Sequence, residues 1–243
     1  MKDLVFISDL HLMPERPEVM DLFIRFNEDI AAKADTLYIL GDFLEVWWGD
    51  DDPAAGYQDV FNSLIKLATE DKTEIFLMHG NRDFMIGEAL AERCHFNIIH
   101  DPHKISLEKR DVLLMHGDTL CIDDVEYQKF RQMVRNPLWQ QQVLTKTLAE
   151  RFQLAQSIRE NSKQSTTGKD EYIMDVNQAE TEKVFLENDI DLIIHGHTHR
   201  PAIHHKTING NDTTRIVLGD WHETGSYLRI NDNSAELRLQ TYQ

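Results

Sequence analysis

Cysteine is scarce in this chain of 243 residues. The two cysteines, Cys94 and Cys121, allow one disulfide at most and exclude a disulfide framework. Long apolar runs are also missing. None approaches the length of a transmembrane helix, and the run near the N-terminus is too short for a secretion signal and is interrupted by Asp9. We therefore expect a cytoplasmic protein, and peripheral association with a membrane stays open.

Positive charge is also in short supply. The chain has 25 Lys and Arg against 42 Asp and Glu, and its formal net charge is −17. Non-specific nucleic-acid binding depends on Lys and Arg that neutralise phosphates, so this balance disfavours nucleic acid as a partner. It does not exclude an anionic substrate, because bound divalent cations can dominate the local field. Hydrophobic residues make up 41%, enough for a core, and the length suits one large domain or one domain with an insertion.

Short apolar runs typical of buried strands alternate with segments of helical periodicity, which predicts an α/β fold. The predicted strands are Leu4–Ser8, Thr36–Leu40, Glu74–Met78, Val112–Met115 and Leu192–Ile194. The predicted helices are Glu18–Ala34, Tyr57–Thr69 and Gly87–Arg93. Three more segments, Arg215–Leu218, Tyr227–Ile230 and Ala235–Leu239, are expected to be closing strands joined by turns.

The stretch from Cys121 to Gln178 differs from the rest, because it contains no convincing strand. Its apolar residues, among them Phe130, Val134 and Trp139, recur largely at helical spacing. We predict a helical cap insertion at 121–178, between the two parts of a core at 1–120 and 179–243. Ordinary helices of the core are the alternative interpretation.

Polar residues with metal-binding chemistry follow directly after the five main predicted strands. The full candidate set is Asp9, His11, Asp42, Asn81, His116, His197 and His199. In α/β folds, sites gather at the carboxyl ends of strands. Each motif alone is weak, since a lone Gly-Asp is usually a turn. Five motifs in this arrangement predict a metal centre, and carboxylate, imidazole and amide donors suit Mn²⁺, Fe or Zn²⁺.

Taken in order, the motifs Asp-x-His, Gly-Asp, Gly-Asn-x-Asp, His-Gly-Asp and Gly-His-x-His resemble the calcineurin-like metallophosphoesterase superfamily. This resemblance implies a four-layer αββα sandwich of two mixed sheets and a centre of two metal ions bridged by Asp42. One ion would take Asp9, His11, Asp42 and His199 as ligands. The other would take Asp42, Asn81, His116 and His197.

Longer motifs narrow the resemblance to the family of UDP-2,3-diacylglucosamine diphosphatases, which act in lipid A biosynthesis. The matching segments include Trp48-Gly-Asp-Asp-Asp52, His79-Gly-Asn-Arg-Asp-Phe84, Ile173-Met-Asp-Val-Asn-Gln178 and His195-Gly-His-Thr-His-Arg-Pro201, and they span nearly the whole chain. The resemblance implies hydrolysis of UDP-2,3-diacylglucosamine to 2,3-diacylglucosamine 1-phosphate (lipid X) and UMP, with two Mn²⁺ ions preferred. It also implies a peripheral enzyme on the cytoplasmic face of the inner membrane, in contact with anionic lipid. We expect no protein partner.

The resemblance also assigns roles to single residues. It implies catalytic roles for Asp42, Asn81, Arg82, His116 and His197. Substrate contacts carry over to Asn81, Arg82, Asp124, Ser162, Thr166, Lys169 and His197, and Tyr127 and Arg159 are further candidates. Thr166 departs from the family pattern, in which an asparagine is usual. Phe130, Val134 and Trp139 are candidates for the wall of an acyl-chain groove.

Arg82 stands where the wider superfamily has a histidine that protonates an alkoxide leaving group. Arginine cannot donate such a proton, because its pKa exceeds about 12. A sugar phosphate leaving group scarcely needs one, so we expect Arg82 to bind the diphosphate and stabilise transition-state charge. An ion pair with Asp83 or Asp118 is the alternative.

The expected mechanism is in-line attack on the α-phosphorus by a hydroxide activated by two metals. Another substrate of the same superfamily, cleaved by a nucleotide diphosphatase or a phosphodiesterase, is the alternative, and a non-catalytic binding module is the second. His195 is expected to pack beside the ligands. Trp47 and Trp48 could form a substrate wall or aromatic core, and no role follows for His222.

Overall fold

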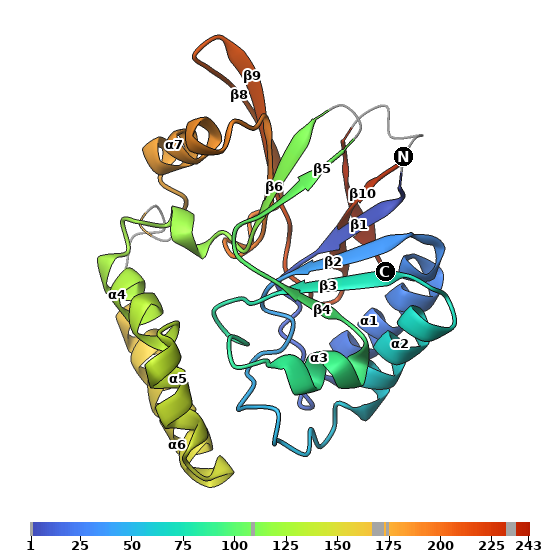
Figure 1. The fold of residues 1–243 in the computed structure, drawn as a ribbon, viewed down its shortest axis with the longest axis vertical. Helices are drawn as coiled ribbons and strands as arrows, with labels where there is room; N and C mark the ends of the chain where they lie inside the picture. Colours follow the sequence, from blue (N-terminus) through green and yellow to red (C-terminus); the bar gives the residue numbers. More distant parts are fainter. Residues whose placement is uncertain (1, 108–109, 167–172, 174, 232–236) are drawn as a thin grey trace.

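The computed structural model describes residues 2–107, 110–166, 173, 175–231 and 237–243, and for 159–166 it describes the helical backbone alone. Two sheets form the centre of the molecule (Figure 1). The first has the strand order β11 (Leu239–Tyr242), β10 (Gly225–Ile230), β1 (Leu4–Ile7), β2 (Thr36–Leu40), β3 (Glu74–Met78) and β4 (Asn97–Ile99). The second has the order β5 (His103–Ser106), β6 (Asp111–Met115), β7 (Leu192–His195), β9 (Asn211–Val217) and β8 (Ala202–Ile208).

Both sheets are mixed. Strands β1 to β4 are parallel neighbours, whereas β10 runs antiparallel to β1. In the second sheet, β6, β7 and β9 are parallel, and β5 and β8 pair antiparallel at the two edges. The carboxyl ends of the parallel strands therefore meet at one edge of each sheet, where the loops that follow them lie together.

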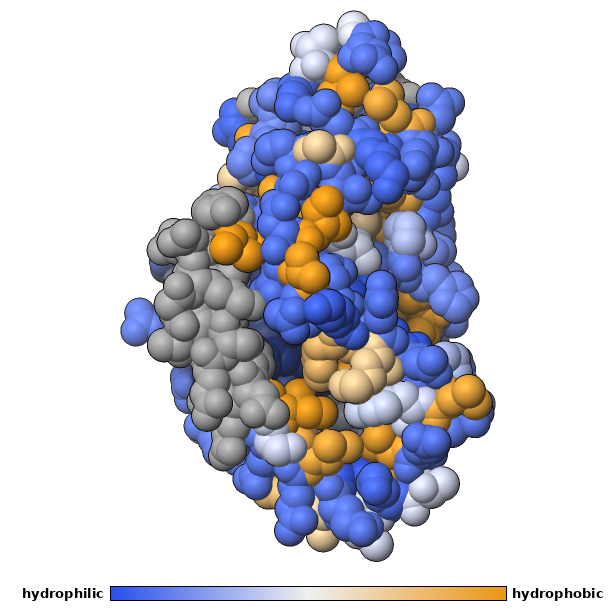
Figure 2. All heavy atoms as spheres, turned by 90° about the vertical axis from the view of Figure 1, so that its left-hand side faces the viewer, coloured by the Kyte–Doolittle hydropathy of each residue, from blue (hydrophilic) through white to orange (hydrophobic). Residues whose placement is uncertain are grey.

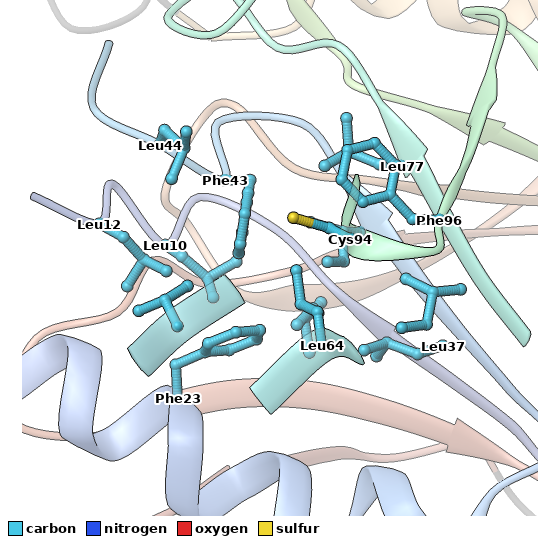
Figure 3. Packing of buried hydrophobic residues seen from close by; sticks show 14 of the residues in the cluster. Leu10, Leu12, Phe23, Leu37, Phe43, Leu44, Leu64, Leu77, Cys94 and Phe96 are labelled. Carbon is cyan, nitrogen blue, oxygen red and sulfur yellow. The ribbon is translucent and has the colours of Figure 1, made fainter. Parts of the chain in front are cut away.

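Three apolar layers separate four layers of secondary structure. Side chains alternate along β1, so Val5 belongs to the cluster under the helices α1 (Pro17–Asp29), α2 (Gln58–Thr69) and α3 (Glu88–Cys94), while Phe6 belongs to the cluster between the sheets. Figure 3 shows the helix-facing cluster, in which Phe23 of α1 packs against Phe43, and Leu64 of α2 packs near Leu37 of β2. The third cluster lies between the second sheet and α7 (Gln178–Asn188). The four-layer αββα prediction is confirmed.

Aromatic stacking helps to join the two sheets. Phe6, Tyr38 and Phe76 are register neighbours on β1, β2 and β3, and each adjacent pair of rings stacks at 5.1 Å between centroids. These rings face the apolar residues of β6 and β7. Burial of such rings is worth roughly 1.5–3 kcal/mol each, so this inter-sheet layer fixes how the loops of one sheet sit against those of the other.

Some predicted boundaries were wrong. The helix expected at Glu18–Ala34 ends at Asp29 and is followed by a 3₁₀ turn at Ala31–Lys33. Of the strand expected at Ala235–Leu239, residues 235–236 lie outside the described residues, and the observed strand begins only at Leu239. Strand β8 was missed because it is an edge strand with mostly exposed residues, so its sequence carries no apolar run.

The one disulfide that the sequence allows is not formed: Cys94 and Cys121 are buried free thiols in different apolar clusters.

The segment between β6 and α7 contains three α-helices, which lie along one side of the sandwich (Figure 1). They are α4 (Val125–Val134), α5 (Pro137–Leu144) and α6 (Leu148–Thr166). Asp124 and Asn136 cap the first two by accepting hydrogen bonds from backbone N–H groups of the first helical turn. The division into a core and a cap at 121–178 stays a prediction. Within the described chain, no helix is both long enough and apolar enough to cross a bilayer.

Candidate metal centre

Seven candidate ligands lie at the carboxyl ends of the parallel strands. Asp9, Asp42 and Asn81 follow β1, β2 and β3, which are neighbours in the first sheet. His116 follows β6 in the second sheet, and the pair His197 and His199 follows β7 beside it. The packing of the two sheets brings these loops together.

The backbone is strained at most of these positions. Asp9, His11, Asp42, His197 and His199 all have positive φ angles, between 50° and 69°. A non-glycine residue in this region costs about 1–3 kcal/mol, and such residues cluster at functional sites. Five of the ten described non-glycine residues with positive φ are candidate ligands, so the strain is concentrated at this edge.

The glycines beside the ligands are required by close approach. A Cβ on Gly80 would lie 2.1 Å from the backbone nitrogen and from Oδ1 of Asp42, and a Cβ on Gly196 would lie 2.2 Å from Oδ2 of Asp9. Neither clash can be relieved, because the atoms struck belong to backbone or to buried ligands. The Gly-Asn and Gly-His motifs therefore let the ligand loops pack against each other.

The first ligand cluster contains Asp9, His11, His199 and Asp42. Nε2 of His11 lies 3.3 Å from Nε2 of His199, which in turn lies 3.4 Å from Oδ1 of Asp9. Oδ2 of Asp42 lies 3.7 Å from Nε2 of His11. Asp9, His11 and His199 each offer one atom to a group small enough to hold an ion.

The second ligand cluster contains Asn81, His116, His197 and the same oxygen of Asp42. Oδ1 of Asn81 lies 3.0 Å from Nε2 of His116 and 2.9 Å from Nδ1 of His197. Oδ2 of Asp42 lies 3.8 Å from Nε2 of His116. One carboxylate oxygen is thus nearly equidistant from an imidazole in each cluster, as the prediction of a shared Asp42 requires. Asp9 also lies close to Asp42 and His116.

These donors fit divalent cations. An ion with bonds of about 2.0–2.2 Å to nitrogen and oxygen spaces its ligand atoms about 3 Å apart, close to the separations above. His116 hydrogen-bonds the carbonyl of Leu40 through Nδ1 at 2.9 Å, and because a carbonyl only accepts, the neutral ring presents the lone pair of Nε2 to the centre. The chain therefore carries two donor sets with the chemistry and the spacing for two ions.

Electrostatics at the centre favour added positive charge. Burial alone lowers the pKa of His116, but Asp42, Asp118 and Asp9 raise it to about 9. Burial and the charge of His116 lower the pKa of His197 to about 4, which keeps that ring in the neutral form that binds metal. A cation that displaced the proton from His116 would satisfy the same carboxylates.

Carboxylates outside the predicted set orient the first cluster. Nδ1 of His11 lies 2.9 Å from Oε2 of Glu45, and Nδ1 of His199 lies 3.3 Å from Oδ2 of Asp220. Burial alone lowers the pKa of His199, but Asp220 and Asp9 raise it to about 10. Partners of this kind fix the orientation of metal-binding imidazoles. The sequence interpretation missed both. Asp220 has a signal, because Gly219-Asp220 follows β9 as Gly41-Asp42 follows β2.

Asp83 braces the ligand loops. Its carboxylate accepts hydrogen bonds from the backbone N–H of Gly80 at 2.7 Å and of Phe43 at 2.8 Å, and so ties the loop that carries Asn81 to the loop that carries Asp42. Burial and the charge of Asp42 raise the pKa of Asp83 to about 6. The Gly-Asn-x-Asp motif thus contains one candidate ligand and the residue that holds its loop.

Arg82 is not paired with either partner that the alternative interpretation gave it. Within the described chain, it forms no ion pair with Asp83 or Asp118, and its buried Nε has no hydrogen-bond partner. Its backbone N–H donates to Oδ1 of Asp42 at 2.8 Å, and its side chain lines the cavity beside the centre. A buried guanidinium nitrogen without a partner is ready to bind an anionic ligand.

Helix α4 is anchored on the ligand loops by one face. The hydroxyl of Tyr127 donates to Asp118 at 2.6 Å, and its ring lies 5.7 Å from that of His197. Nε of Arg131 donates to the same carboxylate at 2.8 Å, and Arg135 donates to the carbonyl of Gly80 at 2.8 Å. These residues recur every four positions, as one face of a helix requires.

Of the remaining predicted substrate residues, the structure describes the side chain of Asp124 only. Asp124 is nearly buried and accepts a hydrogen bond from the backbone N–H of Tyr127, so it serves as the N-cap of α4. Arg159, Ser162 and Thr166 fall on the backbone of α6, and their side chains lie outside the described residues, as does Lys169.

An apolar cavity of about 560 Å³ begins at Asn81 and Arg82 and extends between α4–α6 and the loop around Trp47 and Trp48. Phe130 and Trp139 line it as predicted, whereas Val134 is buried instead. Trp48 lines the cavity and lies 5.4 Å from the ring of Phe152. Figure 2 views the molecule from the left-hand side of Figure 1 and shows apolar residues scattered among polar ones, several of them in the lower half of the face. Trp47 is both core and cavity wall.

The other two histidines singled out in the sequence do not face the centre. His195 is buried, lies 3.0 Å from Arg215, and has a pKa that burial and this arginine lower to about 3. It packs behind the ligand loop, as expected. His222 lies 2.7 Å from Asp220 and 2.8 Å from Arg16, and so supports the carboxylate that orients His199.

Comparison with known proteins agrees with this geometry. The model of the calcineurin-like phosphoesterase family matches residues 3–201. The chain belongs to this family. As a calcineurin-like phosphoesterase it is a hydrolase, and the family binds divalent metal ions.

Curated members of the family are similar over nearly the whole chain. UDP-2,3-diacylglucosamine hydrolase of Stenotrophomonas maltophilia strain R551-3 is 48% identical, with 94% of this phosphoesterase and 95% of the relative covered. The protein of the same name from Xanthomonas axonopodis pv. citri is 45% identical, with 96% and 97% covered. The solved structure of an archaeal phosphodiesterase aligns with a TM-score of 0.51 at 15% identity, covering 98% of this chain and 99% of that one, which supports the fold.

Proposed function

We propose that this phosphoesterase hydrolyses the diphosphate of UDP-2,3-diacylglucosamine, yielding 2,3-diacylglucosamine 1-phosphate and UMP in lipid A biosynthesis. The observation that carries the proposal is the position of Arg82. It lies where a cluster of metal-binding donors meets an apolar cavity. A substrate with a diphosphate beside two acyl chains needs both features at that junction.

The seven predicted ligands would hold two Mn²⁺ ions, with Asp42 shared between them. Oxygen and imidazole donors suit Mn²⁺. Such ions, when bound, lower the pKa of a water and stabilise the attacking and leaving oxygens of an in-line displacement. The chain itself supplies orientation: Glu45 and Asp220 hold His11 and His199, and Asp83 holds the two loops between them.

Arg82 would bind the diphosphate and stabilise its transition state. A guanidinium presents several donors in a fixed plane that matches phosphate oxygens. Asn81 and His197 would contact the same phosphate from the metal side, and Tyr127, fixed by Asp118, would form the wall next to it. The residues 121–178 would act as the cap that covers the lipid.

A nucleotide diphosphatase or a phosphodiesterase with a polar substrate is disfavoured by the cavity. Its lining includes Phe84, Phe130, Trp139 and Phe152, which a polar substrate would leave exposed to water. A non-catalytic binding module is disfavoured by the ligand set, because all seven donors are present at one edge.

The substrate is tested by turnover with Mn²⁺. The purified protein should release UMP from UDP-2,3-diacylglucosamine and lose this activity with a chelator, since it needs the ions to activate water. It should turn over simple phosphomonoesters at least roughly a hundredfold more slowly, because these lack the remote groups whose binding supports catalysis. Equal rates on phosphomonoesters would contradict the proposed substrate.

We also propose that the protein docks peripherally on the anionic cytoplasmic face of the inner membrane. Of the seven exposed large apolar side chains among the described residues, six lie between Ile122 and Phe152, on or beside α4–α6, and only Leu186 lies elsewhere. The most exposed is Leu138, at 69%. Burial of such side chains at an interface favours binding.

Docking is tested by flotation with anionic phospholipid vesicles. Leu138→Glu should weaken vesicle binding by roughly tenfold, because it places a charge where the proposed docking would bury an apolar side chain in the membrane interface. Leu186→Glu is the matched control, since Leu186 is 52% exposed on α7 and should change nothing. Equal binding by both variants would mean that this surface does not touch the membrane.

A further inference from the structure

The cavity extends from Asn81 and Arg82 to Arg151 of α6, which also lines it. Helices α5 and α6 are joined by a short turn after Leu144, and this turn lies at the tip of the helical layer, away from the strand ends that carry the ligands (Figure 1). At this tip the helices contact the loop of Trp48 to Asp51. Charged groups make this contact together with apolar packing, in which the ring of Trp48 lies 5.4 Å from that of Phe152.

Arg151 makes most of this contact. It is an arginine with only 4% of its side chain exposed, and it lines the cavity. Its guanidinium donates to the carbonyl of Trp48 and to Oδ1 of Asp51, each at 2.7 Å, and its second terminal nitrogen pairs with Oδ2 of the same carboxylate. Nε donates to the carbonyl of Lys146 at 3.1 Å. A planar fork satisfied in this way is fixed in place.

The backbone at Gly49 packs so closely against Arg151 that it leaves no space for a Cβ atom. Gly49 has a φ of +125°, and a Cβ there would lie 2.5 Å from Nη1 of Arg151 and 2.7 Å from Cδ2 of Leu144. Only glycine allows the loop and the helix tip to approach so closely. At this tip the cavity wall is therefore a paired guanidinium packed against backbone.

From these contacts we infer that Arg151, fixed by Asp51 and seated on Gly49, sets the maximum length of the acyl chain that the enzyme accepts. The inference rests on the proposed substrate. With the diphosphate at Arg82, an acyl chain in the cavity extends toward Arg151. A chain that is too long must either displace this ion pair or leave methylenes in water, and both are unfavourable.

Substitution of Ala155 should shorten the groove, whereas removal of the Arg151 side chain should lengthen it. Ala155 lies one helical turn after Arg151 on α6 and lines the same cavity. A leucine at this position would fill the space directly before the wall.

The experiment measures kcat/KM for a series of UDP-2,3-diacylglucosamines whose acyl chains differ by two methylenes per step. The wild-type enzyme should show a sharp decline beyond one length. In Arg151→Ala, the ratio of kcat/KM for the next longer chain to kcat/KM for the wild-type optimum length should rise roughly tenfold. This is the gain expected from burying two more methylenes. Ala155→Leu should move the decline to shorter chains. Asp51→Ala, whose side chain is 59% exposed, should resemble Arg151→Ala in weaker form.

Arg229→Ala is the matched control. Arg229 forms the same kind of fork, donating to both carboxylate oxygens of Asp3 and to the carbonyl of Lys33, on a strand remote from the cavity. Its length profile should equal that of the wild type. Thermal unfolding and metal content show that each variant is folded and loaded.

Two results would overturn the inference. One is an Arg151→Ala variant whose kcat/KM is highest at the same chain length as in the wild type, with all values changed by the same factor. Arg151 would then affect the rate without selecting chain length. The other is an Ala155→Leu profile that does not move. Absence of wild-type turnover on every chain length would instead refute the proposed substrate.

Discussion

Asp42→Ala should abolish binding of both metal ions and reduce turnover by at least roughly a thousandfold, the largest effect that we expect from a single substitution. Its Oδ2 lies 3.7 Å from Nε2 of His11 and 3.8 Å from Nε2 of His116, so the same atom belongs to both clusters. Metal content by mass spectrometry, together with hydrolysis rates, measures the effect.

Asn81→Ala provides the matched comparison for Asp42→Ala. Asn81 contacts only the second cluster, through His116 and His197, so this variant should keep about one tightly bound ion while it loses turnover. Circular dichroism would establish that both variants are folded, which matters because Asp42 is buried and also accepts a hydrogen bond from the backbone of Arg82. Two ions retained by Asp42→Ala would contradict its assignment as the bridge.

Arg82→Ala should slow hydrolysis by roughly two to three orders of magnitude with both metals still bound, as loss of one preorganised donor to transition-state charge does. The buried Nε without a partner in the described structure is the reason to expect so large an effect. Arg82→His should not restore the rate, because a phosphate leaving group requires no proton. The measurement is kcat and kcat/KM for each variant at saturating Mn²⁺.

Arg93→Ala is a suitable control for the charge change, since Arg93 lies over the ring of Phe61 and donates to Gln58, away from the cavity. It should keep wild-type kinetics. Rates restored by Arg82→His would mean that the position donates a proton after all, and the proposed leaving group would have to be replaced by an alkoxide.

Local sequence patterns predicted the buried strands and the candidate ligands that follow them. Strands β1, β2, β3, β6 and β7 are buried on both faces, so each appears as a continuous apolar run, and the ligand motifs follow them directly. Strand β8, with its exposed edge, gave no such run and was missed.

Contacts between distant segments could not be predicted in this way. Glu45 meets His11 only because the loops after β1 and β2 run parallel and side by side, and Arg151 meets Asp51 across 100 residues of chain. Neither pair has a characteristic spacing. Asp118 looked like a possible partner of Arg82, but it is bound by Tyr127 and Arg131 of α4, whose position follows from tertiary packing.

The arrangement also explains how one chain can act on a substrate with two unlike ends. The metal-binding loops are braced by buried carboxylates such as Asp83, while the apolar cavity is bounded by helices that are anchored near the centre by α4 and at the far tip by Arg151. With the proposed substrate, the diphosphate and the acyl chains would thus contact separate parts of the chain, which meet at Arg82.

Hydrolysis of UDP-2,3-diacylglucosamine in oxygen-18 water, with mass spectrometry of both products, tests the central claim most directly. Attack at the α-phosphorus predicts Mn²⁺-dependent release of UMP that carries one labelled oxygen and of an unlabelled lipid phosphate. Label in the lipid phosphate alone would contradict attack at that atom, and absence of turnover with Mn²⁺ bound would contradict the proposed function itself.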